Sequence, residues 1–129
     1  MKIRNYRLLS YEANLIEGTL KLLYGHQGAN YKSRIKVNFS GVVAHHLETV
    51  NKCSRIWDIE VEHVDELEES IGVVLERTKD YNFPIPYKTL NNLKKYLLTS
   101  DLKCYRILPT EGMVGVIFAE SIEVDESNA

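Results

Sequence analysis

Polar and apolar residues alternate most regularly in the segment YKSRIKVNF, at positions 31–39. The odd positions hold Tyr31, Ser33, Ile35, Val37 and Phe39, and the even positions hold Lys32, Arg34, Lys36 and Asn38. A period of two is typical of a strand that buries one face. The segment therefore predicts a strand with an apolar face and an opposite face that carries a basic stripe, formed by Lys32, Arg34 and Lys36.

Weaker patterns predict further strands on both sides of this one. They cover positions 3–9, 14–24, 42–44, 56–63, 103–108 and 114–124. In the segment 56–63 we expect Trp57, Ile59 and Val61 to face inward and the alternating carboxylates to face outward. The segment GHQGAN at 25–30 predicts a loop, and Pro109 to Gly112 predict a turn. The run VGVIFA is apolar on both faces, which indicates a central strand that is covered twice.

Two helices are predicted between the strands at 56–63 and 103–108. The first has apolar residues at steps of three and four from Val64 to Thr78, and carboxylates crowd its first turns. The loop NFPIPY ends this helix because proline cannot continue it. Thr89 is expected to cap a second helix that buries Leu90, Leu93 and Leu97.

This order of elements predicts an α+β fold, with a mainly antiparallel β-sheet and two helices packed on one face. A length of 129 residues favours a single domain over positions 1–129. The polar ending DESNA, at 125–129, predicts a frayed tail.

Charge is segregated along the chain although the formal net charge is only −2. Positions 1–55 carry a net charge of +6 and positions 56–80 carry −7. Positions 81–109 carry +4 and positions 110–129 carry −5. Blocks of opposite sign indicate either charged faces or strands whose outer faces neutralise each other. The chain is net acidic, and no aromatic residue is interleaved among Lys32, Arg34 and Lys36. Both features argue against direct nucleic-acid binding.

The sequence favours a cytoplasmic protein. No apolar run approaches the roughly 20 residues that a membrane span needs, and the N-terminus lacks a signal-peptide core. Cys53 and Cys104 form no CxxC pair and have no histidine at zinc spacing, so we expect two reduced thiols.

Four histidines and many carboxylates offer only weak catalytic patterns. His45 and His46 are neighbours, so they point to different faces and do not readily share a metal ion. A metal-dependent hydrolase would need one of them together with His63 and a carboxylate. Asp58, Glu60 and Glu62 lie along one predicted strand face, which is usual for solvated surface. The sequence contains no P-loop, GxSxG or dinucleotide motif, so we expect no enzyme activity, no cofactor and no metal.

The basic stripe and the carboxylates at 58–62 can be related in two ways. If their two strands were antiparallel neighbours, the stripes would form cross-strand ion pairs, each contributing only about 0.2–1 kcal/mol. Otherwise one of the stripes is available to a partner.

Four segments in order, VNFSGVVAHHLE, IWDIE, NFPIPY and EGMVGVIFAESI, resemble a pattern in immunity proteins of bacterial polymorphic toxin systems, including contact-dependent growth inhibition. The resemblance covers roughly residues 31–123. It implies a cytoplasmic antitoxin that binds and neutralises a cognate toxin domain, often a nuclease with a basic cleft. An acidic surface is suited to covering such a cleft because it competes with phosphate groups for the same cations.

On this interpretation the partner-binding residues are carboxylates and one aromatic anchor. They are Trp57, Asp58, Glu60, Glu62, Asp65, Glu66, Glu69, Glu120 and Glu123. The expected state is a monomer or weak dimer. The alternatives are a small metal-dependent hydrolase that uses His45 or His46 with His63, and an adaptor that dimerises through a sheet edge.

Overall fold

The structure is a computed structural model that describes residues 4–128. It contains eight strands and two α-helices. The strands are β1 (Arg7–Asn14), β2 (Thr19–Gly25), β3 (Ser33–Ser40), β4 (Ala44–Glu48), β5 (Arg55–Glu62), β6 (Lys103–Glu111), β7 (Val114–Ala119) and β8 (Ser121–Asn128). The helices are α1 (Leu67–Thr78) and α2 (Leu90–Thr99), and short 3-10 turns include η2 (Val64–Glu66). The predicted α+β class with an antiparallel sheet is confirmed.

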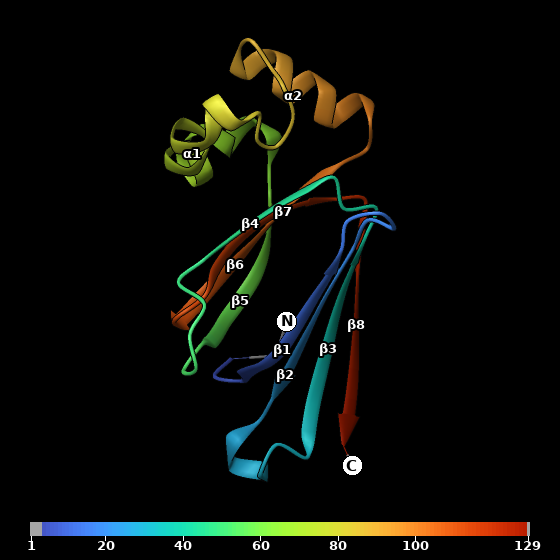
Figure 1. Cartoon of the computed structure of the whole chain (residues 1–129), viewed down its shortest axis with the longest axis vertical. Helices are drawn as coiled ribbons and strands as arrows, with labels where there is room; N and C mark the ends of the chain where they lie inside the picture. Colours follow the sequence, from blue (N-terminus) through green and yellow to red (C-terminus); the bar gives the residue numbers. More distant parts are fainter. Residues whose placement is uncertain (1–3, 129) are drawn as a thin grey trace.

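The strand order is β4-β7-β6-β5-β1-β2-β3-β8, and every pairing is antiparallel. The sheet is folded into two halves that face each other, and both helices lie beyond the outer face of one half (Figure 1). We call β4-β7-β6-β5 the covered half-sheet and β1-β2-β3-β8 the uncovered half-sheet. Between β5 and β1 only one register pair, Arg7 opposite Arg55, joins the halves.

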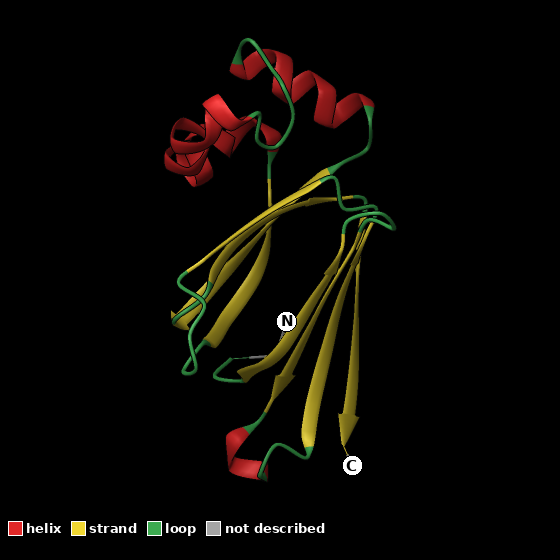
Figure 2. Cartoon of the chain, in the orientation of Figure 1, coloured by secondary structure: helices red, strands yellow, loops and turns green. Residues whose placement is uncertain are grey.

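A bent two-stranded ribbon forms the other connection between the halves. Residues 33–48 supply β3 and β4, and they pair along their length with β8 and β7. At the corner the Val43 amide donates to the Phe118 carbonyl over 2.9 Å, and the Glu120 amide donates to the Ser40 carbonyl over 3.0 Å. Gly41 adopts a left-handed φ of 62° there, which glycine tolerates without strain. The strand predicted at 114–124 is therefore two strands, one in each half-sheet (Figure 2).

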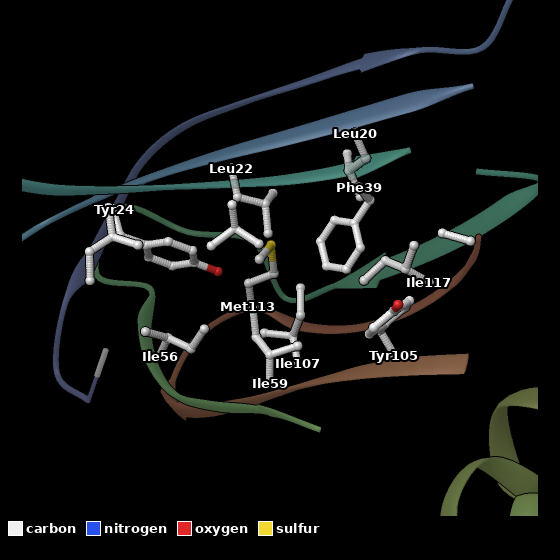
Figure 3. Packing of buried hydrophobic residues seen from close by; sticks show 13 residues of the cluster. Leu20, Leu22, Tyr24, Phe39, Ile56, Ile59, Tyr105, Ile107, Met113 and Ile117 are labelled. Carbon is white, nitrogen blue, oxygen red and sulfur yellow. The ribbon is translucent and has the colours of Figure 1, made fainter. Parts of the chain in front are cut away.

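The main hydrophobic core lies between the two half-sheets. Alternate residues of β2 and β3 point into it, which confirms that Ile35, Val37 and Phe39 form the buried face of β3. From the covered half-sheet, side chains such as Ile107 and Ile117 meet them (Figure 3). Burying large aliphatic and aromatic side chains is the dominant favourable contribution to folding.

A second core lies between the helices and the covered half-sheet. Leu67, Ile71 and Leu75 of α1 and Leu93 and Leu97 of α2 are buried there, against Cys104, Val116 and Phe118. Because its neighbour Ile117 belongs to the main core, β7 is covered on both faces, as VGVIFA predicts. Thr89 forms a capping box with Asn92 at the start of α2, so the predicted cap is confirmed.

Several predicted details are wrong. The first two strands run at 7–14 and 19–25. β6 continues to Glu111, so of the turn predicted at 109–112 only Gly112 lies outside this strand. The polar ending does not fray over 125–128, because these residues extend β8 and pair with β3. Ala129 lies outside the described residues. A β-bulge near Trp57 shifts the phase of β5, so Ile56 and Ile59 are both buried whereas Trp57 is exposed. Val61 is exposed too, although it follows buried Ile59 by two residues in a regular part of the ladder.

Candidate interaction surface

The acidic residues at 58–69 occupy β5, η2 and the first turns of α1, and only His63 lies between β5 and η2. In the β5–β6 ladder, Glu60 lies opposite Arg106 and is exposed. Asp58 is half-buried beside the bulge, and its Oδ1 atom accepts a hydrogen bond from the Ile59 amide over 2.7 Å. The side chain of Asp58 therefore helps to hold the local backbone as well as carrying charge.

Trp57 stands at the surface beside this acidic segment. The residue is 44% exposed, and the guanidinium carbon of Arg4 lies 4.0 Å from the centre of its ring. A cation over an indole face is attracted by the ring quadrupole. The bulge turns Trp57 outward and thus provides the exposed aromatic group that an interface anchor requires. Strict alternation of inward and outward residues does not predict this orientation.

Glu62 differs from the other acidic candidates because its charge is balanced within the molecule. The Nη1 atom of Arg106 lies 3.5 Å from Oε1 of Glu62 and also donates to the Ser70 carbonyl over 3.3 Å. The Glu62 side chain is only 9% exposed. Glu62 therefore helps to hold α1 against the sheet, and its carboxylate is poorly accessible to a partner.

Asp65, Glu66 and Glu69 are exposed around the N-terminal end of α1. Glu68 is exposed there too and belongs to the same group. The partial positive charge at a helix N-terminus stabilises carboxylates at these positions. We call Asp58, Glu60, Asp65, Glu66, Glu68 and Glu69 the β5–α1 acidic surface.

Glu120 and Glu123 do not belong to this surface. Glu120 lies at the corner of the bent ribbon, packed over Gly41, where an added Cβ would lie 2.5 Å from the Glu120 Cδ atom. Glu123 lies on β8, opposite Asn38, in the uncovered half-sheet. The structure thus places these two candidates outside β5, η2 and α1.

The basic stripe and the acidic residues of β5 are not cross-strand neighbours. β3 is flanked by β2 and β8, and β5 is flanked by β6 and β1. Lys36 instead lies opposite Asp125, and Nε of Arg34 donates to the Tyr31 carbonyl over 2.9 Å. The alternative in which Lys32, Arg34 and Lys36 neutralise Asp58, Glu60 and Glu62 is excluded by this strand order.

The histidines do not form a common site. His46 opposes Val116 and contacts Phe83 on the helix side, whereas its neighbour His45 opposes Ile117, a residue of the main core. His63 follows β5, at the other end of the covered half-sheet, three strand spacings or about 14 Å away. No group of three or more histidine, cysteine or acidic residues in the described part of the chain could hold a metal ion.

Glu48 forms an ionic contact that the sequence did not suggest. Its carboxylate lies 3.0 Å from Nε2 of His46 and bonds the guanidinium of Arg77, so it links β4 to α1. The hydrogen bond from His46, with attraction to Arg77, lowers the pKa of Glu48 although burial opposes this shift. His46 and Glu48 share a strand face, but the contact with Arg77 depends on helix packing, so no local spacing could reveal it.

Cys104 is buried beneath the helices, and Cys53 is exposed. Burial, with a smaller effect from the nearby charge of Glu62, raises the pKa of Cys104 to about 12. A thiol with such a pKa is a packing group and a poor nucleophile.

Comparison with known proteins finds no family model that matches the chain, and a search of the curated proteins gives no match either. Among the described residues, neither helix is long and apolar enough to cross a membrane.

Proposed function

We propose that the protein is an immunity factor: it binds a cognate bacterial toxin domain with a basic active cleft and blocks that cleft with the β5–α1 acidic surface. The observation that carries this proposal is the arrangement of six carboxylates on consecutive elements, with Trp57 exposed beside them. Arg106 approaches this region, and its ion pair is with Glu62. Within residues 4–128, the ion pairs involve none of the six carboxylates, so the charge of the surface is available to a partner.

The physical basis is electrostatic attraction combined with one aromatic anchor. A nuclease cleft gathers lysine and arginine side chains to hold phosphate groups, and a fixed group of carboxylates competes for the same cations. Such complementarity speeds association, and a large aromatic side chain supplies contact area at the centre of the interface. Binding of this kind requires no chemistry from the protein itself, in keeping with the scattered histidines and the packed thiol of Cys104.

Calorimetry with the toxin domain encoded by the neighbouring gene tests the proposal. We expect binding tighter than micromolar at low salt, weakening steeply as salt is added because exposed charges are screened. Glu60→Lys and Glu69→Lys should each weaken binding by about tenfold or more, mainly by slowing association. Trp57→Ala should weaken binding by a similar factor and should mainly speed dissociation.

The matched control is Glu123→Lys, which makes the same charge change on the uncovered half-sheet. It should leave binding to the toxin within a factor of about two, since rim and remote charges contribute little. Equal losses for Glu60→Lys and Glu123→Lys would show a diffuse charge effect and contradict a defined surface. Micromolar or weaker binding that none of the variants changes would contradict the function itself.

A further inference from the structure

The outer edge of β8 is the longest regular sheet edge that the described chain leaves open. β8 is last in the strand order and pairs with β3 at eight consecutive positions without an irregularity. On its other side no strand follows within residues 4–128. Alternate amide and carbonyl groups of β8 therefore point away from the sheet, and such a row is a template for another strand.

The other edges are less suited to this role. The β1 ladder contains a register shift between Leu8 and Ser10, and the β5 ladder contains two shifts near Ile56. β4 is regular, but it is only five residues long and Arg77 of α1 bonds its last residue. Bulges and short lengths are the usual means of blocking an edge, and β8 has neither.

The two faces of β8 have different chemistry. Ile122 and Val124 lie opposite Phe39 and Val37 and pack against the main core, although both remain half-exposed. Glu123 and Asp125 point to the opposite face and are exposed. A strand added here would extend the apolar core beside Ile122 and Val124 and would meet Glu123 and Asp125 on the other side. The exposed Glu126 lies beyond Val124 on the apolar side.

The exposed carboxylates of β8 disfavour pairing with the β8 strand of a second copy of the protein. Two antiparallel β8 strands would bring the carboxylates of Glu123, Asp125 and Glu126 close to those of the other copy. Like charges in opposing strand positions destabilise the pairing, and natural proteins use such charges to prevent self-association at edges. The same carboxylates would favour lysine or arginine on an incoming strand.

We propose that β8 is a docking edge for an extended segment of a basic partner protein. The segment adds a ninth strand, with apolar side chains over Ile122 and Val124 and cationic side chains beside Glu123 and Asp125. Main-chain hydrogen bonds supply affinity and the alternation supplies specificity. This site lies on a different strand from the β5–α1 acidic surface, so it can be tested independently of the proposed toxin contact.

The probe for this test is a synthetic peptide as long as β8 that alternates lysine and valine. Titrated into the full chain labelled with 15N, it should shift the amide resonances of β8 and β3. It should also slow hydrogen exchange of the β8 amides that point outward. The double variant Glu123→Lys/Asp125→Lys should weaken binding by about tenfold or more, whereas Glu60→Lys should leave it unchanged.

A second peptide separates strand pairing from simple charge attraction. It has the same sequence, with N-methyl groups on the amides that would face β8, so its charge is retained and its hydrogen bonds are removed. We expect this peptide not to bind. Equal binding of both peptides would overturn the proposal, as would absence of binding by the first peptide. Resonance shifts confined to β5 and α1 would overturn it as well.

Discussion

The Nη1 atom of Arg106 on β6 lies 3.5 Å from Oε1 of Glu62 on β5. The pair lies beneath the first turns of α1, where Arg106 also bonds the Ser70 carbonyl. One carboxylate of the acidic segment is thereby used to attach a helix to the sheet, while its neighbours remain at the surface. The structural role of Glu62 and the contact role proposed for its neighbours can be separated by mutation.

Removal of Arg106 should destabilise the fold. In Arg106→Met the nearly buried Glu62 carboxylate loses its cation, and we expect the free energy of unfolding to fall by about 1–3 kcal/mol. Urea unfolding at neutral pH measures this change. Adding Glu62→Gln should restore part of the loss, because the unpaired charge is then gone. Additive losses in the double variant would contradict a direct interaction.

Gly112 and Gly72 should respond in opposite ways to alanine. Gly112 has a φ of +80°, and a Cβ there would lie 2.6 Å from the Ser54 Cα atom, so Gly112→Ala should destabilise by about 2–4 kcal/mol. Gly72 lies within α1, where a Cβ would meet only Glu68 Cγ, at 3.9 Å. Gly72→Ala should therefore stabilise by about 0.5–1 kcal/mol. Thermal unfolding of both variants tests this contrast, and equal signs would contradict it.

Acidification should reduce stability in two separate steps. Burial, with a smaller effect from His46, lowers the pKa of His45 below its usual 6.5. As the pH falls, His45 therefore binds a proton in the unfolded chain before it does so in the folded chain. The free energy of unfolding then decreases as pH drops from about 6.5 toward the lowered pKa. The pKa of Glu48 is also lowered, from 4.5, so its contribution is complete above that value and is lost as pH falls through the lowered pKa.

Urea unfolding between pH 7.5 and 3 can assign these two steps. His45→Gln should flatten the upper step only, and Glu48→Gln should flatten the lower step only, by about 0.5–1 kcal/mol. An unchanged pH profile in either variant would show that another group titrates in that range.

The two thiols should differ in reactivity. At pH 8 Cys53 is exposed and should react with iodoacetamide, whereas burial raises the pKa of Cys104 to about 12 and should protect it. Mass spectrometry of the intact chain should therefore show one added group in buffer and two in denaturant. Two groups added at similar rates in buffer would indicate that the helices open readily over β6.

Strong periodicity in the sequence was sufficient to predict the strands and helices that bury one face and expose the other. β3 buries Ile35, Val37 and Phe39 as the alternation indicates. The helices bury most leucines of their apolar stripes, although Leu90 of α2 is only half-buried. The exposed position of Trp57 could not be predicted, because it depends on a bulge in which two residues of β5 oppose one of β6.

Long-range pairing set the other limit to prediction. The neighbours of β3 are β2 and β8, and nothing in the local sequence states that Lys36 will oppose Asp125 and not a residue of β5. The bend between β7 and β8 could not be predicted either, because the apolar run at 114–119 is followed closely by Ile122 and Val124. In the structure the ribbon bends at Glu120 and enters the other half-sheet. The candidate surface was therefore predicted in part, with its carboxylates at 58–69 together and those of β8 elsewhere.

The bent ribbon has a consequence for how the protein is made. Its paired residues, such as Phe39 and Ile122, lie roughly eighty positions apart in the chain. During translation β3 leaves the ribosome long before β8 exists, so the apolar face and the unpaired side of β3 remain uncovered until a strand roughly eighty residues later has been synthesised. Native assembly then requires a long loop to close, which is slow. The lysine and arginine side chains along β3 would in the interval discourage association between nascent chains.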